Sequence, residues 1–215
     1  MYIEKIDNGI FRILVPLGTL NTTIYIYKCE EGVAIIDSAT YSTDIDEYVI
    51  PALEEMNISH EDIKYLLLTH NHFDHAGGIQ RLSELFPSAV LGTSFPIDLP
   101  NRIELVDGQK VLGNLQGICL PGHTASSFGF YDTATQTLLS GDCLQLAGVG
   151  KYRDGIEYFD RYFESVNRLK SMDIQRIVAA HEYDPLGSIA EGQNEVAHYL
   201  NKCIEIAEDK MKRYL

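Results

Sequence analysis

The chain has 215 residues, of which 45% are hydrophobic and 22% charged, proportions typical of a globular protein with a substantial core. Seventeen Lys and Arg residues against 31 Asp and Glu residues give a formal net charge of −14. A surface with this excess of negative charge repels nucleic-acid phosphates and anionic lipids. We therefore expect neither nucleic acid nor a membrane surface as a partner.

Targeting signals are not evident in the sequence. No apolar stretch approaches the roughly 18 residues of a membrane span, and the N-terminus lacks a basic segment followed by an apolar one. The four cysteines are far apart and form no C-x-x-C pair, which favours reduced thiols. These features predict a cytoplasmic protein. Because no linker or low-complexity tract interrupts the sequence, residues 1–215 are predicted to form one domain.

The first part of the chain is rich in strands. Short apolar, β-branched or aromatic segments predict strands over 9–15, 21–29, 32–37 and 63–69. Helices are predicted over 42–58, where Pro51 indicates a kink or an early end, and over 76–86.

The second part of the chain repeats this order of elements. Strands are predicted over 89–93, 102–106, 116–121, 127–132, 137–142 and 176–180. Helices are predicted over 156–172 and 188–213. Two sheets stacked face to face, with helices outside, would bury these apolar runs. Catalytic groups are then expected in loops at strand ends.

The segment "LLLTHNHFDHAGG" places four potential metal ligands directly after a buried strand: His70, His72, Asp74 and His75. On an extended backbone, side chains two residues apart project in the same direction. Clustered imidazoles repel one another once protonated and are costly to desolvate unless paired. The cluster therefore predicts a metal site.

Further ligands are needed because a catalytic zinc ion takes about three protein ligands and keeps a position open for water. His123, Asp142 and His181 each follow a strand-like segment, in "CLPGHTASS", "TLLSGDC" and "RIVAAHEYD". His60 and His198 lack this context and are interpreted as bystanders.

The motifs "THNHFDHAGG", "PGHT", "GD" and "AHEYD", in this order, resemble those of the metallo-β-lactamase superfamily of metal hydrolases. The resemblance implies an α/β fold, a four-layer αββα sandwich, with two metal ions at one edge. It implies the following ligands: His70, His72 and His123 for one ion, Asp74, His75 and His181 for the other, and Asp142 as the bridge. Asp74 is also assigned as the catalytic residue.

Two divalent ions roughly 3.5–4 Å apart share a water, lower its pKa towards neutrality and deliver hydroxide to a polarised carbonyl or phosphoryl group. Nitrogen and oxygen ligands suit zinc, and the same set accepts iron or manganese. Asp37 matches an aspartate that supports the metal loop in relatives, and it is predicted to accept the free ring N–H of a ligand histidine. A turn aspartate after a strand is the alternative interpretation.

The substrate is predicted from the segment "GDCLQLAGVGKYRDG", which resembles glyoxalase II enzymes (hydroxyacylglutathione hydrolases). The resemblance implies that Lys151, with Tyr152 as a shifted partner, and Tyr183 hold the thiol carrier of a small thioester or ester. The family's longer helical extension with its basic residues is not matched. The terminal cluster "KMKR" is either a carboxylate-binding site or a solvated helix end.

Two alternative functions remain open within the same superfamily. A mononuclear iron persulfide dioxygenase uses ligands of the types found at His70, His123 and Asp142. An acyl-homoserine lactonase shares the H-x-H-x-D-H-A-G-G run, although the tyrosine expected soon after Asp142 is absent. A flavodiiron oxygen reductase is excluded because it needs Glu at the position of His72.

Overall fold

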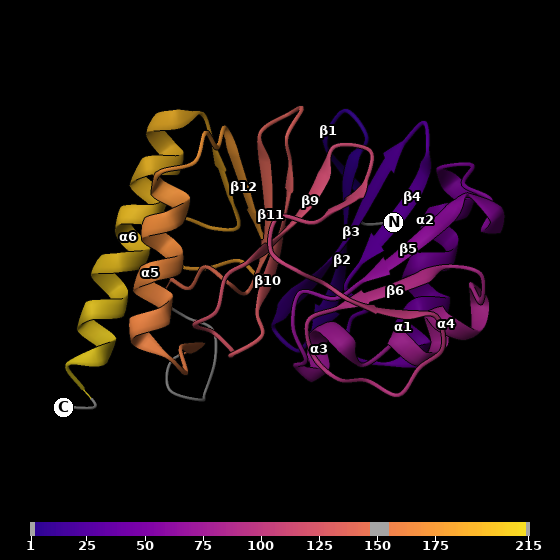
Figure 1. The fold of residues 1–215 in the computed structure, drawn as a ribbon, viewed down its shortest axis with the longest axis horizontal. Coiled ribbons are helices and arrows are strands. Elements are labelled where there is room, and N and C mark those ends of the chain that lie inside the picture. The colour runs from indigo at the N-terminus through magenta and orange to yellow at the C-terminus, as the bar shows by residue number, and fades with distance from the viewer. Residues whose placement is uncertain (1–2, 147–154, 214–215) are drawn as a thin grey trace.

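The computed structural model describes residues 3–146 and 155–213, which form two sheets packed face to face with helices on both outer sides (Figure 1). In this part of the chain the first sheet has seven strands in sequence order: β1 (Ile3–Asp7), β2 (Ile10–Leu17), β3 (Leu20–Cys29), β4 (Gly32–Ile36), β5 (Ile63–Leu67), β6 (Val90–Thr93) and β7 (Arg102–Glu104). Strands β1 to β4 pair antiparallel, and β4 to β7 pair parallel.

The second sheet has six strands among the described residues, in the order β13-β12-β11-β10-β9-β8. They are β8 (Lys110–Leu112), β9 (Leu115–Cys119), β10 (Phe128–Asp132), β11 (Thr137–Gly141), β12 (Arg176–Ala179) and β13 (Ile189–Glu191). Strands β11 and β12 pair parallel, and the other neighbours pair antiparallel.

Helical segments cover the outer face of each sheet (Figure 1). Beside the first sheet lie α1 (Ser42–Asp44), η1 (Ile45–Val49), α2 (Ile50–Glu55), η2 (His60–Asp62), α3 (Phe73–Ala76) and α4 (Ile79–Leu85). Beside the second lie α5 (Phe159–Lys170) and α6 (Gln193–Met211). In the described ranges, no helix combines the length and the apolar character that crossing a membrane requires.

Alternation along the strands explains the layers. On β3, Ile24 and Ile26 join the core beneath the outer helices, whereas Tyr25 and Tyr27 join the core between the sheets. Successive strand side chains point to opposite faces, so a strand with two apolar faces is buried on both. A third core lies between the second sheet and helices α5 and α6. Three cores between four layers confirm the predicted αββα sandwich.

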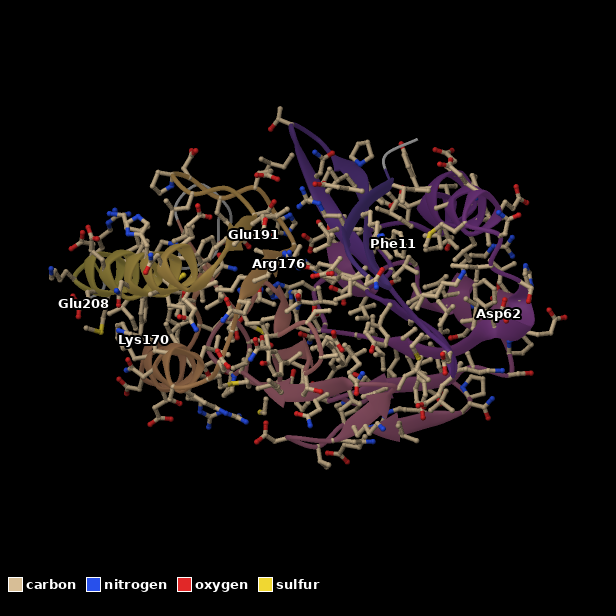
Figure 2. The ribbon with its side chains drawn as sticks, turned by 90° about the horizontal axis from the view of Figure 1, so that it is seen from above. Phe11, Asp62, Lys170, Arg176, Glu191 and Glu208 are labelled. Atoms are coloured by element: carbon tan, nitrogen blue, oxygen red, sulfur yellow. The ribbon has the colours of Figure 1, made fainter. Side chains whose placement is uncertain are left out.

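Polar contacts join the two sheets near one end. The guanidinium of Arg176 on β12 pairs with Asp7 on β1, and its Nη2 lies 2.5 Å from Glu191 Oε1 on β13. Seen from above, Arg176 and Glu191 lie between the helices carrying Lys170 and Glu208 and the sheet carrying Phe11 (Figure 2).

Several predicted elements differ from the structure. The helix expected over 42–58 is divided: η1 is a π-helical turn placed just before Pro51, which lies in the first turn of α2. Pro51 has no N–H to donate, and its ring displaces the carbonyl one turn back, so a wider turn accommodates it. Of the helix expected over 76–86, only Ile79–Leu85 form one (α4), because α3 (Phe73–Ala76) ends at Ala76.

The prediction of a helix starting at 188 was wrong for its first residues. Ile189–Glu191 form strand β13, which pairs with β12, and α6 begins only at Gln193 after Gly192 with φ +82°. Strands β6 and β7, expected with the second group of elements, extend the first sheet instead. Strands β1 and β8 were not predicted. Their pairing partners, rather than their own patterns, place them in sheets.

Candidate metal centre

The seven predicted donors converge at one edge of the sandwich, in loops that follow strands β5, β9, β11 and β12. Their ligand atoms fall into three groups, and within each the atoms lie within 4.8 Å of one another. The groups are His70, His72 and His123; His70, His75 and Asp142; and Asp74, His75 and His181. Donors as far apart in sequence as 70 and 181 are therefore neighbours in space.

The loop after β5 is held by Asp37, which follows the neighbouring parallel strand β4. Its carboxylate accepts the backbone N–H of Thr69 at 2.8 Å and the Thr69 hydroxyl at 2.8 Å. The same carboxylate lies 2.8 Å from His75 Nδ1. Asp37 is buried and adopts φ +65°, a conformation that Asp and Asn tolerate better than most side chains. One carboxylate thus fixes both ends of the donor loop.

Close backbone approach explains the glycines of "HAGG". A Cβ atom on Gly77 would lie 2.0 Å from the Thr40 carbonyl oxygen, and one on Gly78 would lie 2.3 Å from the Ser38 carbonyl oxygen. Ser38 and Thr40 belong to the segment that follows β4. Glycine at these two positions lets α3 and α4 pack directly against that segment, which keeps His75 beside Asp37.

Each fully buried imidazole uses Nδ1 for a protein partner. His70 Nδ1 lies 3.0 Å from the Thr69 hydroxyl, His123 Nδ1 lies 2.6 Å from the Gly155 carbonyl, and His181 Nδ1 lies 2.7 Å from the Asn21 carbonyl. A carbonyl accepts only, so Nδ1 carries a proton, and Nε2 presents a lone pair whenever the ring is neutral. Partners of this kind orient metal-ligating histidines.

The inward nitrogens crowd one another. His123 Nε2 lies 3.1 Å from His70 Nε2 and 2.9 Å from His72 Nδ1, and His75 Nε2 lies 3.4 Å from His181 Nε2. At this range two neutral rings set their lone pairs against each other, and two protonated rings set their positive charges against each other, so either arrangement repels. Around one tetrahedral cation with bonds of about 2.0–2.1 Å, ligand atoms stand about 3.3 Å apart. The residues present therefore fit divalent cations, and the nitrogen and oxygen donors suit zinc, iron or manganese.

Asp142 lies between the two sets of imidazoles. Its Oδ2 is 3.6 Å from His123 Nε2, while its Oδ1 is 3.6 Å from His75 Nε2 and 3.4 Å from His181 Nε2. Asp74 belongs to one side only, with Oδ2 3.3 Å from His181 Nε2. This geometry is compatible with a carboxylate shared by two cations.

The pKa values of the histidines differ between the two sides. Burial lowers the pKa of His123 to about 4, and burial together with neighbouring imidazoles lowers the pKa of His70 well below its ordinary value. Burial also lowers the pKa of His181, but Asp142 and Asp74 outweigh it and raise that pKa to about 11. The pKa of His75 is likewise raised, because Asp142 and Asp37 overcome its burial. A cation that binds to His75 and His181 therefore displaces protons.

The predicted substrate residues are placed less completely. Lys151 and Tyr152 lie outside the described residues. Tyr183 is fully buried, and its hydroxyl lies 3.0 Å from Asp142 Oδ1. In the "KMKR" cluster, Lys210 is buried and donates to the Leu146 carbonyl at 3.0 Å, so it is not a solvated residue.

Some residues of this centre were not identified from the sequence. Thr69 and Gln145 are polar residues in apolar segments, "LLLTH" and "DCLQLAG", and this isolation is the signal that could have indicated them. The carbonyl groups of Asn21 and Gly155 are backbone atoms, for which no sequence signal exists. His60 and His198 lie away from the centre: His60 packs against Phe86, and His198 is exposed on α6.

Known proteins share both the sequence and the fold. A family model described as "Metallo-beta-lactamase superfamily" matches residues 17–94. Hydroxyacylglutathione hydrolases are similar: that of Prochlorococcus marinus is 30% identical over 179 residues, 79% of this chain and 69% of the relative. That of Pelagibacter ubique is 28% identical over 176 residues, 78% of this chain and 71% of the relative. That of Pseudomonas syringae is 37% identical over 125 residues, but only 47% of its length is spanned.

Solved structures extend the likeness to the whole fold. A metallo-beta-lactamase from Cronobacter sakazakii superposes with a TM-score of 0.76 at 18% identity, covering 99% of this chain and 95% of the other. A metallo-beta-lactamase family protein from Thermus thermophilus superposes with a TM-score of 0.75 at 19% identity, covering 97% and 82%. The chain belongs to the metallo-beta-lactamase superfamily, and its curated relatives include hydroxyacylglutathione hydrolases.

Proposed function

We propose that this protein is a dinuclear metal hydrolase that cleaves a small thioester or ester, with zinc as the resident metal. The observation that carries the proposal is the pair of donor sets joined by Asp142, with the buried Nε2 atoms of both sets turned inward. When bound, two such cations lower the pKa of a water towards neutrality and polarise a carbonyl group. The substrate class rests on the similarity to hydroxyacylglutathione hydrolases.

The burial of the donor residues leaves the centre open to a substrate on one side. His72 and Asp74 are half-buried, whereas His70, His75, His123, Asp142 and His181 are buried. A substrate therefore approaches past His72 and Asp74. Asp74 is the proposed catalytic carboxylate, because it combines a place among the donors with access to the approaching substrate. No nucleophilic Cys is needed: Cys143 is buried, and burial raises the pKa of its thiol well above the ordinary value.

The leaving group is proposed to contact Lys151, with Tyr152 beside it. A contact made equally in the ground and transition states raises KM and leaves kcat nearly unchanged when it is lost. Lys151→Ala should show this pattern. Lys170→Ala is a suitable control, since Lys170 ends helix α5 on the outer layer (Figure 2). A collapse of kcat in Lys151→Ala would assign that lysine to the chemistry instead.

The function is tested with metal analysis and a substrate panel on the same preparation. Chelator-stripped protein is reloaded with Zn²⁺, Fe²⁺ or Mn²⁺, and each form is assayed on thioesters of glutathione and of a smaller thiol, an ester, a lactone and a phosphodiester. The proposal expects about two ions per chain and turnover of a thioester or ester. One iron per chain with oxygen uptake on glutathione persulfide would support the dioxygenase instead. A preference for lactones would support the lactonase.

A further inference from the structure

The Asp142 carboxylate presents a different oxygen to each donor set. Oδ2 faces His123, whereas Oδ1 faces His75 and His181. The terminal torsion of an aspartate is broad, so a free carboxylate samples a range of rotations. Sharing its two oxygens between two cations requires that one rotation be held.

The hydroxyl of Tyr183 holds one of these oxygens. It lies 3.0 Å from Asp142 Oδ1, and a carboxylate only accepts hydrogen bonds, so the phenol donates. The side chain of Tyr183 is fully buried, and its ring packs edge-on against His181 at a centroid distance of 5.9 Å. Tyr183 therefore acts on the oxygen that faces the set of Asp74, His75 and His181.

Gln145 holds Tyr183 in turn. Gln145 Nε2 donates to the Tyr183 hydroxyl at 3.1 Å and to the Asp142 carbonyl at 2.9 Å. Because the single hydroxyl hydrogen of Tyr183 goes to Asp142, the phenol oxygen needs a donor, and this requirement fixes the amide orientation. The backbone N–H and C=O of Gln145 both bond to the Tyr162 hydroxyl on α5, at 2.8 and 3.1 Å.

In this orientation of the Gln145 amide, its oxygen Oε1 is left in an unfavourable position. Gln145 is 1% exposed, and its Oε1 has no hydrogen-bond partner among the described residues. A buried acceptor without a partner is unfavourable. Turning the amide over would place Oε1 against the Asp142 carbonyl and remove the donor to Tyr183. The orientation is thus maintained by the network around Asp142.

We propose that Tyr183 and Gln145 are positioning residues that fix the rotation of the Asp142 carboxylate, so that Oδ1 serves the cation of Asp74, His75 and His181. This inference rests on the metal binding of the proposed function. It assigns Tyr183 to the metal centre rather than to the substrate contact that resemblance implies. Loss of the Tyr183 hydroxyl should weaken the binding of one of the two ions selectively.

The experiment measures Zn²⁺ affinity alone, by competition with a chromophoric chelator, in chelator-stripped protein. Each ion is read separately: in a His72→Ala background the remaining tight site is that of Asp74, His75 and His181, and in an Asp74→Ala background it is the other. Tyr183→Phe is introduced into both, and Gln145→Met serves as a second variant. Tyr199→Phe is the matched control, because Tyr199 is a buried tyrosine whose hydroxyl donates to the Gly187 carbonyl at 3.2 Å.

Tyr183→Phe should weaken zinc binding in the His72→Ala background by about 10–100-fold, the usual effect of losing a partner of a metal ligand, with little change in the Asp74→Ala background. Gln145→Met should weaken the binding of the same ion, and Tyr199→Phe should change the binding of neither ion. Unchanged affinity with a raised KM in otherwise wild-type enzyme would return Tyr183 to the substrate site and overturn the inference. Equal weakening of both ions would overturn it as well. Wild-type protein that binds no zinc would instead refute the proposed function, and this inference with it.

Discussion

The two halves of the molecule supply the same centre in different ways. The first sheet contributes four donors from a single loop, residues 70–75, and one carboxylate, Asp37, holds that loop at Thr69 and His75. The second sheet contributes three donors from three separate loops, and each has a different partner. His123 uses the Gly155 carbonyl, Asp142 uses Tyr183, and His181 uses the Asn21 carbonyl of β3 in the other sheet.

This difference separates local from long-range organisation. In the first half, the end of β5 and the carboxylate of Asp37 are enough to place four of the seven proposed donors. In the second half, His181 takes its Nδ1 partner from the first sheet, so its placement requires that both sheets have packed. Besides the Asn21 contact, the Thr23 hydroxyl on β3 donates to the Ala180 carbonyl at 2.7 Å, directly before His181. We therefore expect substitutions in the two halves to have different effects on metal binding and on stability.

The largest effect is expected at the residue that joins the halves. Asp142→Ala removes oxygens near both sets of imidazoles and leaves two cations facing each other without a shared carboxylate. Loss of a residue that hydrogen-bonds to a metal ligand costs up to roughly 100-fold in activity, and Asp142→Ala should cost more than that. The variant should also lose both metals. His72→Ala should abolish turnover while removing one metal more than the other. Elemental analysis beside turnover measures this, and Asp142→Ala protein that retains both metals and near-normal turnover would show that Asp142 is not the bridge.

A smaller effect is expected at Asp37, which holds the donor loop of the first half. Asp37→Asn places an amide against His75 Nδ1, which favours the tautomer with a proton on the metal-facing nitrogen. Zinc affinity of the set containing His75 should fall by about 10–100-fold. Asp132→Asn is the matched control: Asp132 is also buried and accepts the Thr135 N–H at 3.0 Å and the Tyr27 hydroxyl at 3.1 Å, away from the donors. Equal zinc affinity in the two variants would contradict the role of Asp37.

The smallest effect is expected at the contact between the sheets. Thr23→Val keeps the shape of the side chain but leaves the Ala180 carbonyl without this donor, which should lower the free energy of unfolding by about 1–3 kcal/mol. The exposed Thr133, which bonds the Asn114 carbonyl, gives the control Thr133→Val, with a change of about 0.5 kcal/mol or less. Denaturant unfolding of the chelator-stripped proteins measures both. If the two variants lose the same stability, the contact between the sheets is not a significant support of the second half.

Much of the centre could be predicted from the sequence because its signals are local. The spacing of His70, His72, Asp74 and His75 after a buried strand is visible in a few adjacent residues, and so are the strands, whose two apolar faces predict burial on both sides. Three further donors at strand ends could be named as well. Fold class and candidate ligands follow from such patterns because each depends on neighbours in the chain.

Other features depend on contacts between residues far apart in the chain, and only the tertiary structure decided them. Strand β13 and the two edge strands β1 and β8 exist because partners pair with them, and β6 and β7 join the first sheet for the same reason. The tautomers of His123 and His181 depend on the carbonyls of Gly155 and Asn21, which have no side-chain signature. The amide of Gln145 and the phenol of Tyr183 meet Asp142 only after α5 and the end of β12 have packed beside it. Packing brings these groups together from across the chain, and no spacing along the sequence encodes that proximity.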